Sequence, residues 1–550
     1  MTEYHLVKSV IFCYNICMEQ TYFSSTINVP NNYYYTPIQL KLPLVLDETI
    51  KIDDPVYTFD KVMKGVNLEK YLVSNRKDRR GRRGYNPITM LKVVLFAFQL
   101  KGYASTREIE DLCYNDIRFR WLLQYEKDYP THMTISNFIN KYLKYNIADI
   151  FSDINKYIFD TDGVDTNHLY IDGTKIEANA NKYTWVWKKA CISNRDKLFK
   201  KITLLLDEIN KNLILESIEY KVNETYEIDY IEYLFNDYTK RYKVDEKTFI
   251  YGKGHQKSLI QRRYELLKEY LNKLKEYATK IETCGEHRNS YSKTDNDATF
   301  MRIKKDYMGN DQLLPAYNIQ FGISDEYIAV LDVNQFASDS DCFIPLIEKF
   351  HHTFNKYPEY PVGDAGYGSY NNYLYCEQKG MKKYMKFAMY KKETEDKDYH
   401  SDPFRPINFK FNDNGELICP NNKKFNFLFN KPVKGNKYGR TEEVYECENC
   451  SNCPFKSKCT KSQGNRRINI NKELTSFHKE VIENLQSIQG SLLRMNRSIQ
   501  AEGAFGILKQ DRFYRRIVRK GLTQVMLELT LIACAYNIYK YHNKLHRNLV

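Results

Sequence analysis

A short apolar run that ends in a carboxylate constrains this chain more than any other stretch of its sequence. Residues 169–171 are apolar, Asp172 follows them, and Gly173 comes next. The run has the length and composition of a buried strand. A carboxylate at the end of such a strand is costly unless it is paired, reaches water or binds a metal. An isolated aspartate would cap a turn, so a role in metal binding requires partners elsewhere in the chain.

The overall charge favours a polyanionic partner. The chain has 550 residues, which predicts about two to four domains. Its 83 Lys and Arg against 69 Asp and Glu give a formal net charge of +14. Such an excess is typical of nucleic-acid-binding proteins, although part of it reflects a composition rich in lysine. No continuous apolar stretch of about 18 residues exists, so no membrane span is expected.

The cysteines predict a reducing compartment. The chain has 13 of them, and most are scattered singly, unlike a secreted disulfide framework. Residues 1–18 include a weak apolar run without a small-residue cleavage site, so no signal peptide is expected. We therefore expect a soluble, cytoplasmic protein.

Two arginine-rich stretches are suited to contact with nucleic-acid phosphates. One lies at 76–84 and the other at 512–520, where aromatic residues are interleaved. The first stretch has no apolar side chain and cannot pack a core, and each stretch is also compatible with a solvated loop. The arginines concerned are Arg76, Arg79, Arg80, Arg82 and Arg83 in the first stretch, and Arg512, Arg515, Arg516 and Arg519 in the second.

The N-terminal part is predicted to be helical. Residues 1–60 have weak periodicity and are interpreted as an extended arm, and residues 61–160 as a helical domain. Expected helices begin near Asp60, after Asn86, after Ser105 with a capping box, at Phe119 and after Thr134. Short helices joined by tight turns are typical of a DNA-binding domain, and a plain helical bundle is the alternative.

The catalytic part is predicted to be α/β. Strand patterns at 316–323, 327–333, 360–364 and 383–389 follow the first one, with helices at 342–354 and 370–379 between them. This order predicts a ribonuclease-H-like, mixed five-stranded sheet flanked by helices, formed by residues 165–391 and 474–545. The fourth strand ends in Asp364, and it should lie beside the strand of Asp172.

A third carboxylate is expected from a flanking helix. Glu502 lies on a predicted helix at 487–509, among small residues that allow close packing. Two aspartates and a glutamate around two Mg²⁺ ions, for which Mn²⁺ can substitute, are suited to phosphodiester chemistry. Lys509 lies close to two helical turns beyond Glu502, on the same side, where it would bind a phosphate.

Two insertions interrupt this part. Residues 185–295 contain an apolar seam at 260–281, interpreted as a helical hairpin or a dimerisation coil. Residues 392–470 are rich in cysteine. Their spacing suits a structural zinc knuckle, with unliganded thiols as the alternative. The expected ligands are Cys447, Cys450, Cys453 and Cys459, and Cys419 is an alternative ligand.

Three motifs resemble those of a known family. Residues 170–185 resemble the first-aspartate motif of the DDE transposases of bacterial insertion sequences, residues 362–369 the second-aspartate motif, and residues 500–509 the glutamate motif. Residues 297–301, 316–320 and 86–143 also resemble the family. Related transposases often carry Tyr and Arg where this chain has Met495 and Ser498, with Arg494 and Arg497 nearby.

The resemblance implies a DNA transposase with Asp172, Asp364 and Glu502 as metal-binding catalytic residues. Its partner would be double-stranded DNA, both the terminal inverted repeats and the target, and it would act as a homodimer on DNA near the nucleoid. Arg494 and Arg497 join the expected DNA contacts. The alternatives are a non-transposing nuclease of the same fold and a domesticated, catalytically silent DNA-binding protein.

Overall fold

The computed structural model describes the chain between residues 50 and 547, with short gaps. The described residues are 50–72, 84–124, 129–213, 219–252, 254, 256–303, 312–413, 415–434, 436 and 438–547. Most of the expected arm at 1–60 lies outside this range. So do the five arginines of the first basic stretch, Arg76, Arg79, Arg80, Arg82 and Arg83.

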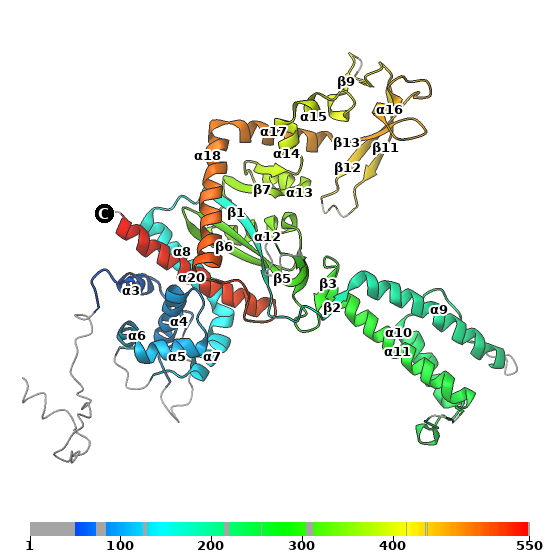
Figure 1. Ribbon diagram of the computed structural model, residues 1–550, viewed down its shortest axis with the longest axis horizontal. Coiled ribbons are helices and arrows are strands. Elements are labelled where there is room, and N and C mark those ends of the chain that lie inside the picture. The colour runs from blue at the N-terminus through cyan, green and yellow to red at the C-terminus, as the bar shows by residue number, and fades with distance from the viewer. Residues whose placement is uncertain are drawn as a thin grey trace, which may run out of the picture.

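A mixed sheet occupies the centre of the molecule (Figure 1). β1 pairs antiparallel with β5 and parallel with β7, so the predicted neighbourhood of the first and fourth strands is confirmed. The sheet has six strands where five were predicted, because the short β4 also pairs with β5. The arrangement is consistent with a ribonuclease-H-like domain. Its strands are β1 (His168–Glu177), β4 (Thr299–Arg302), β5 (Leu313–Ser324), β6 (Tyr327–Asn334), β7 (Tyr360–Gly368) and β8 (Tyr384–Phe387).

Helices pack on the sheet, and the last of them is a core helix. They are α12 (Phe343–Phe354), α13 (Tyr370–Gln378), α17 (Lys472–Gln486), α18 (Ile488–Arg497) and α20 (Leu522–Arg547). Within the described part of the chain, α20 is the one helix long and apolar enough to cross a membrane. However, 72% of its most apolar window is buried, and it packs on β6. Its composition is therefore explained by the core.

A helical module precedes the sheet, at the lower left of Figure 1. The predicted capping box at Ser105 is confirmed. The first helix begins at Pro55 and not near Asp60, because Asp54 caps it and proline suits a first helical position. Thr131, and not Thr134, caps the helix at 132–138. The helices are α3 (Pro55–Gly65), α4 (Pro87–Lys101), α5 (Thr106–Asn115), α6 (Ile117–Leu122), α7 (His132–Phe138), η1 (Ile139–Leu143) and α8 (Lys144–Asp162).

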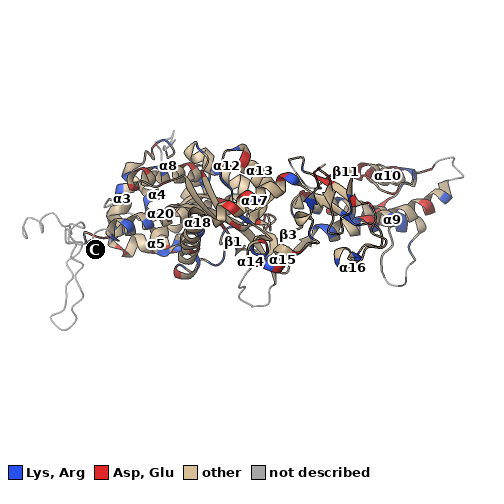
Figure 2. Ribbon diagram, turned by 90° about the horizontal axis from the view of Figure 1, so that it is seen from above, with Lys and Arg blue, Asp and Glu red and all other residues tan. Residues whose placement is uncertain are grey.

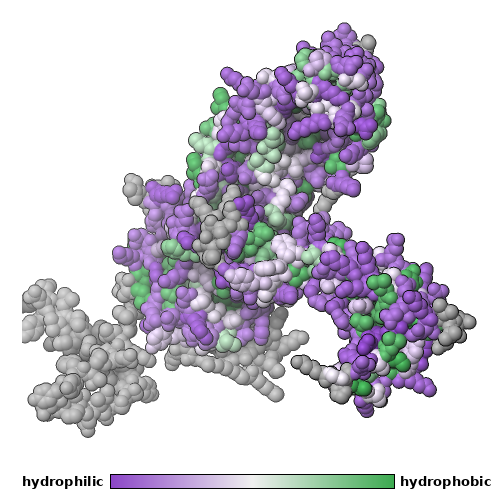
Figure 3. Space-filling model, turned by 45° about the vertical axis from the view of Figure 1, so that its right-hand side comes forward, coloured by the Kyte–Doolittle hydropathy of each residue, from purple (hydrophilic) through white to green (hydrophobic). Residues whose placement is uncertain are grey.

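Residues between β1 and β4 form an arm that projects from the sheet (Figure 1). Its described residues form three α-helices, α9 (Lys188–Leu213), α10 (Ile228–Arg241) and α11 (Leu259–Cys284), where two were predicted. Most of the apolar seam of α11 is buried against α9 and α10, so it packs within the chain. Both signs of charge occur along the arm (Figure 2), and hydrophobic patches lie scattered on its surface (Figure 3). Leu204 and Tyr233 are among its exposed side chains.

The Cys-bearing segment lies at the opposite side from the helical module (Figure 1). It begins with two short helices, α14 (Tyr390–Glu395) and α15 (Lys397–Ser401). A two-stranded sheet of β9 (Lys410–Phe411) and β10 (Leu417–Ile418) follows. A three-stranded sheet of β11 (Phe425–Pro432), β12 (Thr441–Cys447) and β13 (Arg467–Ile470) completes it, with α16 (Lys456–Cys459) between the last two strands.

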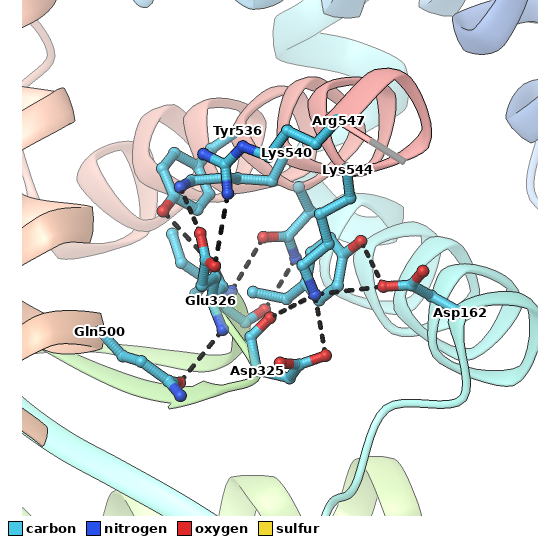
Figure 4. A network of polar contacts seen from close by, with 11 residues as sticks. Asp162, Asp325, Glu326, Gln500, Tyr536, Lys540, Lys544 and Arg547 are labelled. Carbon is cyan, nitrogen blue, oxygen red and sulfur yellow. Dashed lines mark hydrogen bonds and ion pairs between the residues drawn. The ribbon is translucent and has the colours of Figure 1, made fainter. Parts of the chain in front are cut away.

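Ion pairs link the C-terminal end of α20 to the turn between β5 and β6 (Figure 4). Lys540 contacts Glu326 at 2.8 Å, and Lys544 contacts Asp325 at 2.8 Å. The backbone N–H of Glu326 donates to Gln500 at 3.1 Å. The turn therefore ties α20 to the helical segment that carries Glu502.

The other end of α20 is capped from a distance. The backbone N–H of Leu522, the first residue of the helix, donates to Asp297 at 2.8 Å, and that of Gly521 donates to Asp295 at 3.3 Å. A carboxylate in this position satisfies free N–H groups and interacts favourably with the helix dipole. Asp297 belongs to one of the family-like motifs, and the structure gives it this structural role.

Replacement of Asp297, which caps α20, should lower the stability of the protein while the sheet keeps its structure. We predict that Asp297→Ala lowers the free energy of unfolding by about 0.5–2 kcal/mol, because a helix N-terminus loses its acceptor. Urea denaturation followed by circular dichroism measures this. Asn296→Ala, at the exposed neighbouring position, is the control and should leave stability unchanged. Equal effects of the two substitutions would contradict the capping role.

Candidate active site

Parallel pairing places the two predicted aspartates side by side. Tyr170 of β1 lies opposite Val362 of β7, and the regular pairing of these strands ends there. Asp172 and Asp364 each follow two residues later, so they lie at the same level just beyond the paired region. Both side chains point to the face that Tyr170 and Val362 define, because side chains alternate along a strand.

Asp172 is largely buried, and its neighbours include both positive and negative charges. Its Oδ1 accepts the backbone N–H of Gly173 at 2.9 Å, and Nη1 of Arg497 lies 3.7 Å from its Oδ2. Burial raises the pKa of Asp172 to about 6, against the opposing effects of Arg497 and the Gly173 N–H. The charges of Asp364 and Asp339 raise this pKa further. The two predicted aspartates are therefore within electrostatic reach of each other.

Asp364 lies in β7, where the pairing of this strand with β8 is irregular, and it is half exposed. Its Oδ1 accepts the backbone N–H of Gly366 at 2.8 Å. Lys386 of β8 is also close, since the charge of Asp364 acts to raise its pKa. Burial and the neighbouring Arg494 and Arg497 outweigh this and lower the pKa of Lys386. The sequence analysis did not select Lys386, which stands in a strand pattern without a recognisable motif.

The helix that carries Glu502 packs on the same face of the sheet. Phe505 stacks on Phe321 with ring centroids 4.7 Å apart, and Phe321 lies directly opposite Asp172 on β5. The single predicted helix at 487–509 contains two π-helical turns in the structure. Its parts are α18, η6 (Ser498–Glu502), α19 (Gly503–Gly506) and η7 (Ile507–Asp511). π-Helical turns occur frequently at functional sites.

Glu502 itself points away from the aspartates. Its side chain is exposed, and its Oε1 accepts the hydroxyl of Ser498 at 2.9 Å. In the residues that the structure describes, no three His, Cys, Asp or Glu side chains form a group that could hold a metal ion. The helix thus brings Glu502 to the correct side of the sheet, and its role as a metal ligand stays a prediction.

Several of the predicted DNA-contacting residues have partners within the protein. Arg497 contacts Asp172, and Lys509 donates to the hydroxyl of Thr174, two residues beyond Asp172. Burial lowers the pKa of Lys509, while the charge of Asp172 opposes this. Both cations therefore lie beside the candidate site.

The second basic stretch divides into buried and exposed residues. Arg512 is largely buried and donates to the carbonyl of Phe98 at 3.2 Å, which links the helical module to the sheet domain. Arg519 donates to Asn140 at 2.7 Å. Arg515 and Arg516 are exposed, although Arg516 lies 3.4 Å from Glu177. Arg494 is half buried and contacts Ser491 at 3.2 Å.

Five cysteines gather in the Cys-bearing segment. Cys419, Cys447 and Cys450 lie in one small buried cluster, and burial together with Cys450 raises the pKa of Cys447 to about 12. The other two thiols are only partly buried. Cys453 accepts from Asn421 at 3.6 Å, and Cys459 accepts from Arg466 at 2.8 Å.

The raised pKa of Asp172 predicts a pH-dependent cost to stability. At about pH 4 the carboxyl is neutral in the folded chain and about half ionised in the unfolded chain, so little of this cost is present, whereas near pH 7.5 its burial as an anion favours unfolding. Asp172→Asn removes this cost. Its stability relative to the wild type should rise by about 1–3 kcal/mol between these two pH values.

Urea denaturation in the presence of a chelator at the two pH values measures this difference. Asp511→Asn changes an exposed aspartate and is the control, for which no such rise is expected. A difference between Asp172→Asn and the wild type that does not change with pH would contradict the burial argument.

Two parts of the chain match known families. Residues 418–542 match the family described as Transposase DDE domain, and residues 44–141 match the family described as Transposase domain (DUF772). The first match includes Glu502 and the five gathered cysteines, and neither match includes Asp172 or Asp364. No curated protein and no solved structure matches the chain. The two family matches support the assignment of this chain as a DDE-type transposase of an insertion-sequence type.

Proposed function

We propose that the chain cleaves DNA at the ends of its insertion sequence and joins them to target DNA. The observation that carries this is the pair Asp172 and Asp364, held level on parallel strands within a transposase of the DDE type. Two like charges in a partly buried place repel each other unless a cation lies between them. Mg²⁺, or Mn²⁺ in its place, fits this donor set because both ions prefer carboxylate oxygens.

Each residue of the site has its own role in this proposal. Asp172 and Asp364 would hold the divalent ions, and Glu502 would complete the set with its side chain released from Ser498. Bound metal would activate a water or 3′-hydroxyl nucleophile and stabilise the leaving oxygen. Arg497 neutralises Asp172 in the meantime, and its guanidinium becomes available for a phosphate once the ion is bound. Lys509 lies beside Thr174, where it would hold another phosphate.

DNA would reach this site over arginines that are at least partly exposed. Arg494, Arg515 and Arg516 are the described candidates, and the arginines of the first basic stretch would add to them. Contacts of this kind bind the backbone without reading sequence. We further infer that the partner is double-stranded DNA, at terminal inverted repeats and at the target. The protein would act as a homodimer on DNA, in the cytoplasm near the nucleoid.

Loss of one aspartate should abolish cleavage but not DNA binding. We predict that Asp172→Ala or Asp364→Ala lowers the rate of Mg²⁺-dependent cleavage of labelled element ends by about a thousandfold or more, since metal-bound stabilisation of the transition state disappears. Glu502→Ala should act in the same direction. Gel-shift experiments should show unchanged binding of the ends by all three variants.

Asp511→Ala provides the matched control, because this exposed residue lies on the same helical segment as Glu502 and should cleave as the wild type does. Binding without cleavage by the wild-type protein would favour the silent DNA-binding alternative. Cleavage without joining of the 3′ ends to target DNA would favour a plain nuclease.

We also propose that the Cys-bearing segment binds one structural zinc ion. Backbone N–H groups donate to two of the sulfurs, from Lys423 to Cys419 at 3.3 Å and from Arg466 to Cys450 at 3.5 Å. Amide donors around sulfur favour the thiolate form that a metal requires. The ligands would come from Cys419, Cys447, Cys450, Cys453 and Cys459, drawn together by the ion.

Metal analysis of the purified protein tests this. We expect about one zinc per chain, which Cys450→Ser loses and Cys191→Ser, in the arm, retains. The Cys450→Ser variant should also show a lower melting temperature, because a structural zinc ion contributes to folding. Absence of zinc from the wild-type protein, or equal zinc in both variants, would contradict the proposal.

A further inference from the structure

A third aspartate lies at the candidate site, and no sequence motif pointed to it. Asp339 begins the short turn η4 (Asp339–Asp341) between β6 and α12. An aspartate in such a place usually caps a helix, but no side chain caps η4 or α12. Instead, Oδ1 of Asp339 accepts the side-chain amides of Asn318 at 2.7 Å and Gln320 at 3.2 Å.

The two amides belong to a fully buried polar network on β5. Gln320 also donates to Asn318 at 2.9 Å, and the hydroxyl of Tyr367 donates to Gln320. Asn318 further donates to the carbonyl of Phe336 at 3.2 Å. Buried polar groups are tolerated when each has its partners, and such networks fix side-chain orientation. This network therefore fixes one oxygen of Asp339.

The other oxygen faces Asp364. A Cβ placed on Gly366 would lie 3.0 Å from Oδ1 of Asp364 and 3.3 Å from Oδ2 of Asp339, so both oxygens border the same small space. Among the described residues, no hydrogen-bond donor contacts Oδ2 of Asp339. The charge of Asp339 also raises the pKa of Asp172 and of Tyr367, which agrees with its position beside the pair.

The network also explains residues that the transposase motifs contain without an evident role. Gly173 lies directly opposite Gln320, and a side chain at Gly173 would collide with the amide of Gln320. Asn318 and Gln320 belong to the family-like stretch 316–320, and Tyr367 follows Asp364 by three residues. These three segments converge on Asp339.

We propose that Asp339 is a further carboxylate of the divalent-cation site, with Oδ1 held by Asn318 and Gln320 and Oδ2 presented to the ion beside Asp364. The inference rests on the proposed function of Asp172 and Asp364. The charges of Asp364 and Asp339 both act on Asp172, and Oδ1 of Asp364 and Oδ2 of Asp339 border the same space. Arg497 is the ion-pair partner of Asp172, so negative charge remains that a divalent cation would neutralise. Asp339 thereby supplies a ligand from the sheet side even while Glu502 points away.

Titration of the metal-free, full-length protein with Mn²⁺ in a calorimeter tests the proposal. Asp339→Asn keeps the Oδ1 acceptor but removes the charge, and we expect its Mn²⁺ affinity to fall at least about tenfold. The Mg²⁺ concentration for half-maximal cleavage of element ends should rise by a similar factor. Asp341→Asn, an exposed residue of the same turn, is the matched control and should leave both quantities unchanged.

Asp339→Glu separates a charge effect from a structural one. It retains the carboxylate, so it should bind Mn²⁺ more tightly than Asp339→Asn, and all variants should melt near the wild-type temperature. Equal Mn²⁺ binding by Asp339→Asn and the wild type, while Asp172→Asn loses it, would overturn the inference and leave the proposed function intact. Equal losses in Asp339→Asn and Asp339→Glu would also overturn it. No Mn²⁺ binding by the wild type would overturn both proposals.

Discussion

The parallel pairing of β1 with β7 is the constraint on which the site depends. It sets Asp172 level with Asp364 at an edge where burial already disfavours negative charge. A buried anion lowers stability, and natural proteins retain such groups mostly where function requires them. The surrounding structure is arranged accordingly. Arg497 neutralises part of the charge, and the cap on α20 and the network in Figure 4 hold the helices that border the site.

This arrangement separates rigid from adjustable parts. Asp172 and Asp364 lie on central strands, and Asp339 is fixed by amides of β5. Glu502, in contrast, ends a π-helical turn and is exposed. Gln500, two residues earlier, is tied to the turn between β5 and β6. A change of helical register after Gln500 would therefore turn Glu502 while Gln500 stays in place.

Local sequence signals were sufficient for much of this account. Alternating and continuous apolar runs located β1, β5, β6 and β7, and with them both aspartates, because strand patterns and turn residues are local properties. The capping box at Ser105 was equally local. The predicted first residue of a helix was wrong where an earlier residue caps the helix, as Asp54 caps α3. Helix α10 of the arm was missed. Its buried residues pack in one cluster with residues of α9 and α11, a contact that local spacing does not show.

The remainder depends on tertiary contacts that no spacing encodes. Asp339 follows a strand within a run of serines and aspartates, and it is identified only by amides that β5 brings to it. The contact of Arg497 with Asp172 joins residues far apart in sequence. Arg512 is buried because the helical module packs against it. The basic residues around it in the sequence give no indication of this contact. Charge patterns alone therefore do not distinguish exposed arginines from those with partners inside the protein.

Anomalous diffraction from crystals soaked in Mn²⁺ tests the central claim most directly. The account predicts a manganese peak between Asp172 and Asp364, with carboxylate oxygens about 2.0–2.3 Å from the ion and Asp339 among the ligands. A crystal without a peak between these two aspartates at saturating Mn²⁺, or with manganese bound only elsewhere, would contradict it.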